Sequence, residues 1–239
     1  MTPNTWPPVH RTALKRQPPL AACLALIFIF SGCVSLQLSQ FQDYAARGDH
    51  EWVAAQTIEC RRASEGCGQL HLTKGDACFQ LAKMDREPGV NFACAADELE
   101  KGLALKQSFD AAGVQLQYRE KLCESLRRVH GWQSGKAAEE TPDRLLQAAN
   151  ALYQLAPESV PAVYYLASAR LMEIKPILAD INAATRVPIC LRLKRTVNRV
   201  LEVIETARGD TPPHWDRFAG DYQRLAFDLG AAMQAAECR

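Results

Sequence analysis

Cysteines are the residues whose spacing in this sequence most directly suggests chemistry. Cys60 and Cys67 flank the short segment RRASEG, and Cys78 and Cys94 lie about equally far from the segment REPG. Residues at equal distances from the turn of a helical hairpin face each other across its two helices. In an oxidising compartment, both pairs are therefore candidate disulfides. Spacing suggests no partner for the remaining three cysteines of this part of the chain: Cys123, Cys190 and Cys238.

The same region also offers ligands for a metal ion. Cys67, His71 and Cys78 share one face of a helix, at offsets of four and eleven residues, and Cys60 is nearby. Three cysteines and one histidine can bind zinc tetrahedrally. The spacing is not that of a known zinc ribbon or finger, and oxidation competes with metal binding. A metal-binding or enzymatic use of residues 60–94 is the alternative to the disulfides.

No catalytic constellation is visible in the sequence. It contains no nucleophile elbow, no HExxH motif and no phosphate-binding glycine loop. Four histidines lie on different expected helices: His50, His71, His130 and His214. Because no site can be assembled by role, we expect no enzyme, no catalytic residues and no metal or other cofactor. The 28 basic and 27 acidic residues also give no reason to expect nucleic acid as a partner.

The N-terminal segment has the composition of an export signal. Arg11, Lys15 and Arg16 precede an apolar run over residues 20–30, and no acidic residue comes before it. A bilayer-spanning helix needs about 20 apolar residues, so this run is too short. A basic segment, a short apolar run and small residues at its exit are typical of a secretory signal.

The segment FSGC at residues 30–33 resembles the lipobox of bacterial lipoproteins, with Phe30 where leucine is usual. The resemblance implies a signal peptide over 1–32, cleavage before Cys33 and covalent lipid, palmitate included, on that cysteine. Residues 33–40 would form the lipidated tether. Val34 and Ser35 follow in place of an inner-membrane retention aspartate, which resembles sorting to the periplasmic face of the outer membrane. An uncleaved anchor and an ordinary signal peptide are the alternatives.

The rest of the chain has a helical pattern. It is rich in alanine, leucine, glutamate, glutamine and arginine at helical spacing and has almost no strand alternation. The pairs Thr141–Pro142 and Thr211–Pro212 predict helix starts, because threonine caps a helix and proline is tolerated at its first position. Ser159 in SVPAVYYL predicts a further start. We therefore expect an all-α fold.

Several segments resemble the tetratricopeptide repeat, a helix–turn–helix unit of about 34 residues. They are YAARGDHEWVAAQ at 44–56, LTKGDACFQLA at 72–82, ADELEKGLALK at 96–106 and ALYQLAPESVPAVYYLASARL at 151–171. The resemblance implies a tetratricopeptide-like array, an α-α superhelix, over residues 41–175. Residues 176–239 follow the pattern poorly, and we expect them to form divergent helices that cap the array.

Repeat arrays of this kind have a concave surface formed by the first helix of each unit. By resemblance, ten residues are expected to face that groove: Leu72, Thr73, Asp76, Phe79, Gln80, Tyr164, Tyr165, Ser168, Leu171 and Met172. Aromatic and methionine side chains are favoured at interface cores. The alternative for each residue is simple packing against the next helix.

A basic stretch lies further along the chain. Arg192, Arg195 and Arg199 share a face of a helix expected near 187–208, and no acidic residue occurs in this stretch before Glu202. This patch is a candidate dock for an acidic partner, lipid headgroups or cell-wall polymer. The alternative is an ordinary solvated helix face.

These features predict a membrane-tethered periplasmic scaffold that binds envelope proteins. By family resemblance, it would be an assembly factor for an envelope machine such as a pilus, a secretion system or outer-membrane protein assembly. The alternatives are a cysteine-rich metal-binding protein or enzyme using residues 60–94, and a purely structural envelope lipoprotein.

Overall fold

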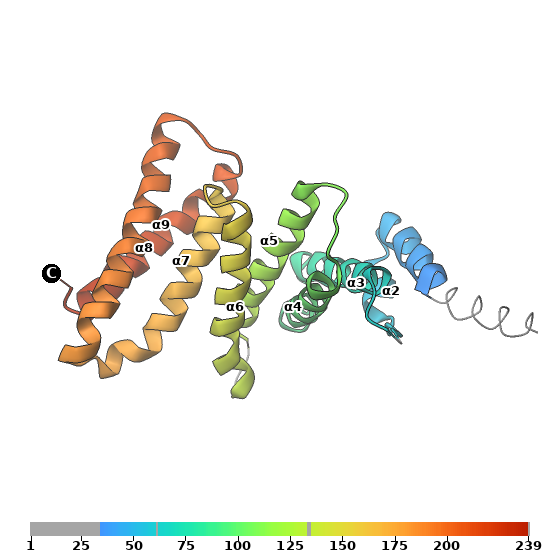
Figure 1. The fold of residues 1–239 in the computed structure, drawn as a ribbon, viewed down its shortest axis with the longest axis horizontal. Coiled ribbons are helices and arrows are strands. Elements are labelled where there is room, and N and C mark those ends of the chain that lie inside the picture. The colour runs from blue at the N-terminus through green and yellow to red at the C-terminus, as the bar shows by residue number, and fades with distance from the viewer. Residues whose placement is uncertain (1–33, 61, 133–134, 239) are drawn as a thin grey trace, which may run out of the picture.

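A computed structural model describes residues 34–60, 62–132 and 135–238 (Figure 1). All regular secondary structure in these ranges is helical, which confirms the all-α class. A helix over residues 34–46 is followed by α2 (His50–Ala55), α3 (Glu65–Lys83), α4 (Pro88–Leu105), α5 (Ala112–Val129), α6 (Lys136–Leu155), α7 (Val160–Ile174), the 3-10 helix η1 (Lys175–Asp180), α8 (Ala183–Gly209) and α9 (Trp215–Ala235). The predicted signal peptide and the lipid site at Cys33 lie outside the described residues.

Several helices begin where a polar side chain caps them. The Ser64 hydroxyl accepts a hydrogen bond from the backbone N–H of Cys67 at 3.2 Å, and Ser159 does the same for Ala162 at 3.3 Å. Asn182 forms a capping box at the start of α8. These caps satisfy backbone N–H groups that have no partner within the helix. The helix start predicted at Ser159 is confirmed.

Two other predicted helix starts are wrong. Helix α6 begins directly after Gly135, whose φ of 62° turns the chain into the helix, and Pro142 lies inside α6. Glycine adopts that positive φ without steric cost, so it sets the start in place of the later cap. Thr141 is fully buried within the helix. The start expected at Thr211 is also displaced, because α9 begins at Trp215.

The helices are arranged in two layers (Figure 1). Each helix from α2 to α9 packs against the next one along the chain. Helices α3, α5, α7 and α9 also contact one another in that order, and we call them the inner layer. Within the described residues, α4, α6 and α8 do not contact one another, so the outer layer is open.

Helices α3 and α4 approach each other most closely where glycine removes a side chain. A Cβ atom on Gly75 would lie 2.7 Å from Cγ of Leu99, and a Cβ on Gly102 would lie 2.7 Å from Cγ of Leu72. Both leucines are fully buried. Each helix therefore offers a glycine opposite a leucine of its partner, which fixes the register of the pair.

A buried hydrogen bond joins α9 to α7, and a disulfide joins α8 to the end of the chain. The buried hydroxyl of Tyr222 on α9 donates a 2.8 Å hydrogen bond to the carbonyl oxygen of Val160, at the start of α7. A disulfide between Cys190 and Cys238 joins α8 to the chain just beyond α9. This bond was not predicted from the sequence, although the segment 210–214 between α8 and α9 lies midway between the two cysteines, which are 48 residues apart.

We predict that Gly102→Ala destabilises the protein by about 1–3 kcal/mol, because the added methyl overlaps the backbone and side chain of Leu72. The matched control is Gly230→Ala in α9, where no atom lies within 4 Å of the new Cβ. That control should leave stability unchanged or raise it by up to about 1 kcal/mol, since alanine favours helix over glycine. Urea unfolding of the three proteins measures the difference. Equal stability of the two variants would contradict the close contact of α3 with α4.

Candidate binding cleft

The inner layer lines an open cavity of about 480 Å³, which we call the cleft. Three buried aromatic rings form its floor: Phe79 of α3, Tyr165 of α7 and Phe218 of α9. Gln80 and Gln117 add side-chain amides, and charged groups of both signs complete the lining. The cleft therefore combines apolar area with hydrogen-bonding groups from four helices.

A nearly buried carboxylate, Glu124 of α5, lies in the wall of the cleft. It accepts hydrogen bonds from Arg127 at 3.0 Å, from Arg128 at 2.8 Å and from the Tyr165 hydroxyl at 3.3 Å. Burial raises the pKa of Glu124, but the two guanidinium groups outweigh burial and hold that pKa below its ordinary value. The charged carboxylate thereby joins α5 to α7.

A second ion pair joins α3 to α5. The ammonium group of Lys121 lies 2.5 Å from a carboxylate oxygen of Asp76. It also lies 5.9 Å from the ring centre of Phe79 and 5.7 Å from that of Tyr118. Aromatic faces attract cations at such distances. Burial raises the pKa of the Tyr118 hydroxyl, and the negative charge of Asp76 adds to that effect. The lysine is therefore held between a carboxylate and two rings.

A third ion pair joins α5 to α9. Glu120 lies 3.5 Å from Arg217, whose guanidinium group also lies 4.9 Å from the ring centre of Phe218. Burial raises the pKa of Glu120, and the positive charge of Arg217 compensates only part of this effect. The charge of Glu120 is thus less well stabilised than that of Glu124, although both acids lie on one face of α5.

The ten residues predicted to face a groove fall into three groups. Phe79, Gln80 and Tyr165 line the cleft, and Asp76 lies beside it through its ion pair with Lys121. Five others are buried core residues: Leu72, Thr73, Tyr164, Ser168 and Leu171. Their prediction as groove residues is corrected, because neighbouring helices cover these faces of α3 and α7. The last, Met172, is half-buried and packs against the core.

The predicted basic patch lies along α8, but two of its arginines are paired. Arg192 lies 2.6 Å from Glu173, and Arg199 lies 2.6 Å from Glu202. Arg195 is exposed and makes no ion pair with any residue that the structure describes. The patch is therefore only partly available to a partner.

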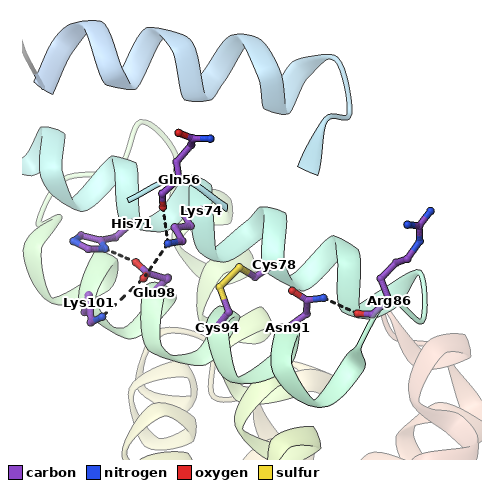
Figure 2. The surroundings of a disulfide bond; sticks show 9 residues. All are labelled: Gln56, His71, Lys74, Cys78, Arg86, Asn91, Cys94, Glu98 and Lys101. Carbon is purple, nitrogen blue, oxygen red and sulfur yellow. Dashed lines mark hydrogen bonds and ion pairs between the residues drawn. A yellow bond between two sulfur atoms is a disulfide. The ribbon is translucent and has the colours of Figure 1, made fainter. Parts of the chain in front are cut away.

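Both disulfides predicted from the turns are present, Cys60–Cys67 and Cys78–Cys94. Figure 2 shows the second one bridging α3 and α4. Cys123 is a free, fully buried thiol, and burial raises its pKa far above the ordinary value. A thiol with such a pKa is a poor nucleophile at neutral pH.

The candidate zinc ligands are only partly brought together. The sulfurs of Cys60 and Cys67 and a ring nitrogen of His71 lie within 4.8 Å of one another. The two sulfurs are bonded to each other, and Cys78 is bonded to Cys94. Zinc binds cysteine as the thiolate, so these oxidised sulfurs do not suit it.

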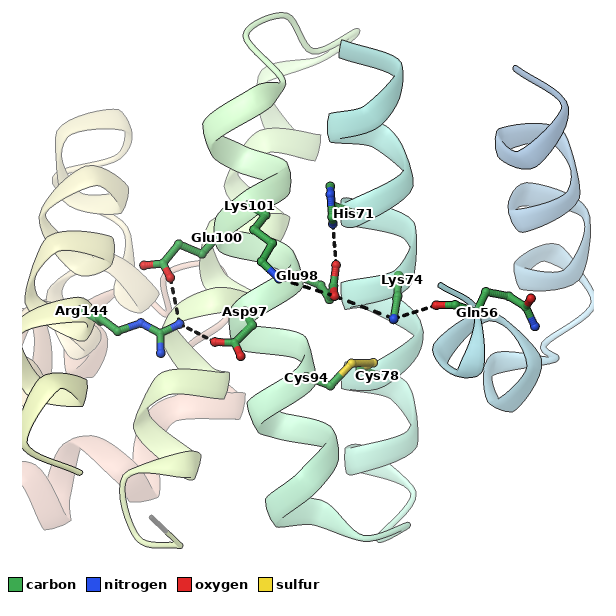
Figure 3. A network of polar contacts seen from close by, with 10 residues as sticks. All are labelled: Gln56, His71, Lys74, Cys78, Cys94, Asp97, Glu98, Glu100, Lys101 and Arg144. Atoms are coloured by element: carbon green, nitrogen blue, oxygen red, sulfur yellow. Dashed lines mark hydrogen bonds and ion pairs between the residues drawn. A yellow bond between two sulfur atoms is a disulfide. The ribbon is translucent and has the colours of Figure 1, made fainter. Parts of the chain in front are cut away.

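His71 belongs instead to a polar network across α3 and α4 (Figure 3). Its Nδ1 atom lies 2.5 Å from Glu98, and the same carboxylate lies 3.8 Å from Lys74 and 3.9 Å from Lys101. Lys74 also donates a 2.8 Å hydrogen bond to the carbonyl oxygen of Gln56. Glu98 thus connects α3 and α4 and, through Lys74, the segment that follows α2.

Reasoning from the sequence missed the contribution of α5. This helix supplies Glu120, Lys121 and Glu124 to the cleft, yet none of them was among the predicted groove residues. The available signal is the interleaving of these charged residues with the core residues Leu122 and Leu126. Charges so close to an apolar helical face need partners in the fold.

Comparisons with models of protein families, with curated proteins and with solved structures found no match to this chain. None of the described helices has both the length and the apolar character that crossing a membrane requires.

We predict that Glu124→Gln destabilises the protein by about 3 kcal/mol at neutral pH, because it leaves Arg127 half-buried without its carboxylate. The folded pKa of Glu124 is lowered, so the stability it contributes is present above the ordinary glutamate pKa and is lost as pH falls through the folded pKa. The difference between wild type and variant should therefore shrink below about pH 4. Thermal unfolding across pH measures it.

Glu120→Gln is the matched control for Glu124→Gln, four residues away on the same helix. Because the folded pKa of Glu120 is raised, its charge is disfavoured in the fold at neutral pH. Glu120→Gln should therefore keep or increase stability at neutral pH. If both variants lose the same stability, the distinction between the two carboxylates is incorrect.

We predict that alkylation without reductant modifies none of Cys60, Cys67, Cys78 and Cys94, and that Cys123 reacts only in denaturant, because it is buried. Peptide mass mapping after alkylation measures this, and reduction should release all of them. Metal analysis of the same sample tests the alternative, which is a metal site in residues 60–94. One equivalent of zinc together with four alkylatable thiols would support a metal site in residues 60–94.

Proposed function

We propose that the protein is a membrane-tethered, protein-binding scaffold that uses the cleft as a docking surface for an envelope protein. The observation that carries the proposal is that four successive inner-layer helices line one continuous cleft. Aromatic side chains are favoured at protein interfaces, and side-chain amides can pair with the main chain of a partner. The cleft has the buried rings of Phe79 and Phe218 in its floor and the more accessible amides of Gln80 and Gln117 beside them.

The proposal includes a tetratricopeptide-like array, with α8 and α9 as its divergent C-terminal pair. Three features support it. Helices pack in consecutive antiparallel pairs, alternate helices form one inner layer, and glycines permit close approach at Gly75 and Gly102. In repeat arrays, each unit contacts mainly its neighbours, and the inner helices form an extended binding surface.

The proposal also includes lipidation of Cys33 and location at the periplasmic face of the outer membrane. The FSGC segment supports the lipid, and the disulfides support an oxidising compartment. Acyl chains hold a protein at a membrane because each buried methylene contributes about 0.8 kcal/mol. Tethering confines the cleft to the membrane surface, which raises its effective concentration for a resident partner.

We propose binding rather than catalysis because the cleft charges pair with one another. Asp76, Glu120 and Glu124 each have a cationic partner. The first two pairs join α5 to α3 and α9, and Glu124, paired with Arg127 of its own helix, is joined to α7 by the Tyr165 hydroxyl. Groups held in this way stabilise the shape of a surface. An assembly factor for a pilus, a secretion system or outer-membrane protein assembly is the role that this reading favours.

A photo-crosslinking amino acid at Gln117, an exposed position of the cleft, tests the proposal in the native host. We predict a discrete adduct with an envelope protein, identified by mass spectrometry, because the side chain faces the cleft. The same probe at the exposed Gln223 of α9, which does not line the cleft, should not form this adduct. Cys33→Ser should abolish most of the adduct, since the untethered protein loses its effective concentration.

Two results would contradict the proposal. Equal adducts from both glutamine positions would mean that the cleft is not the docking surface. An adduct yield that Cys33→Ser leaves unchanged would mean that tethering at this residue plays no part.

A further inference from the structure

A second concave surface lies on the opposite face of α7 from the cleft. Tyr165 faces the cleft, whereas helical spacing puts Val163, Ala167 and Arg170 on the other side of α7. There, two open cavities of about 250 and 550 Å³ share Asn150 and Arg170 as lining residues. Helices α6 and α8 form the walls and α7 the floor. We call these two cavities together the arginine groove.

The groove exists because α6 and α8 do not close over α7. Both pack on α7, but the two do not contact each other within the described residues. Figure 1 shows α7 between them. A gap between two helices that rest on a third forms a channel, and its direction follows the helices.

The lining of the arginine groove is strongly basic. It contains Arg170, Arg192, Arg195 and Arg199 against a single acidic residue, Glu173. Glu173 pairs with Arg192, and Arg199 pairs with Glu202 outside the lining. Arg170 and Arg195 form no ion pair with any described residue. Two guanidinium groups, one on the floor and one on a wall, thus have no counter-charge from the described chain.

The rest of the lining suits an extended protein segment. Val163, Leu166 and Ala167 provide an apolar floor. The exposed amides of Asn150 and Gln154 lie one helical turn apart on α6, and each can both donate and accept hydrogen bonds. The groove thus has apolar side chains, amides that can pair with the main chain of a partner, and cations. These groups suit a peptide segment that carries both apolar and acidic side chains.

We propose that the arginine groove binds an extended acidic segment of a partner protein, with Arg170 and Arg195 as its carboxylate-binding residues. The inference rests on the proposed function, since it names a kind of partner for the scaffold. Guanidinium groups bind carboxylates through paired hydrogen bonds, and complementary charge gives specificity. Arg170 is half-buried on the floor between two helices, a position that a flat bilayer surface does not reach. This geometry favours a protein chain over lipid headgroups.

Selection from a phage-displayed library of short random peptides on the purified full-length protein tests the proposal. We predict enrichment of peptides that carry aspartate or glutamate between apolar residues. A selected peptide, titrated by fluorescence anisotropy, should bind the variant R170E/R195E about tenfold or more weakly, because each charge-assisted hydrogen bond is lost and replaced by repulsion. Its affinity for wild type should fall with added salt.

The matched control is R208E/R224E, which changes the net charge equally at two exposed arginines outside the groove. It should retain the affinity of wild type within about twofold. Circular dichroism confirms that each variant is folded. If R170E/R195E does not fold, R170Q/R195Q removes the charges with a smaller perturbation, and the same weakening is expected.

Three outcomes would overturn the proposal: no selected peptides, selected peptides without acidic enrichment, or equal binding to both charge variants. Cosedimentation with phosphatidylglycerol vesicles covers the other source of anions. A loss of vesicle binding in R170E/R195E that the control does not share would assign the groove to the membrane and refute a protein partner.

Failure here is distinguishable from failure of the proposed function. The cleft and the groove lie on opposite faces of α7, so an adduct from Gln117 can form even where no peptide binds the groove. An adduct from Gln117 with no acidic peptide selected would refute the groove alone.

Discussion

Both candidate surfaces depend on the burial of α7. Every residue from Val160 to Ala169 is buried, and the helix contacts α5, α6, α8, α9 and η1. A helix that is apolar on all sides must be covered on all sides. The neighbours of α7 cover it without all touching one another, and the spaces left between them are the cleft on one side and the arginine groove on the other. The surfaces are thus consequences of how one central helix is packed.

Charges fix the geometry of the inner layer at α5. Removing Glu124 from water costs several kcal/mol unless its partners compensate, and Arg127, Arg128 and the Tyr165 hydroxyl do so. Because Tyr165 comes from α7, a shift of α7 against α5 would break one of these bonds. Aromatic packing alone tolerates small displacements, whereas a buried charge does not. The carboxylate therefore restricts the relative position of the two helices beside the cleft.

What the sequence predicted correctly was local. Cys60–Cys67 and Cys78–Cys94 close over short segments, and Ser159 caps the helix that follows it, so each depends on neighbouring residues in the chain. These features follow from spacing and backbone chemistry alone.

What the sequence did not reveal depends on long-range contacts. The Cys190–Cys238 bond needs α9 to fold back along α8 over 48 residues, so it depends on the packing of two long helices and not on a short segment. Tyr164 and Tyr165 are adjacent, chemically identical and both buried, yet only Tyr165 belongs to the floor of the cleft, because the arrangement of the neighbouring helices determines which face of α7 the cleft adjoins. Arg170 was not among the residues predicted to bind a partner, because it lines a groove only where α6 and α8 are separated.

The disulfides divide the described chain into covalently closed ends and a non-covalent centre. Two close the α3 region and one closes α8 with the end of α9, and no disulfide involves a described residue of α5, α6 or α7. A disulfide stabilises typically by about 2–4 kcal/mol by restricting the unfolded chain. Disulfides therefore restrain local unfolding least in the centre, where stability depends on packing and ion pairs. The centre supplies α5 and α7 to the cleft and α6 and α7 to the arginine groove, whereas α3 of the cleft and α8 of the groove carry disulfides. Each surface therefore combines a cross-linked helix with helices that no disulfide restrains.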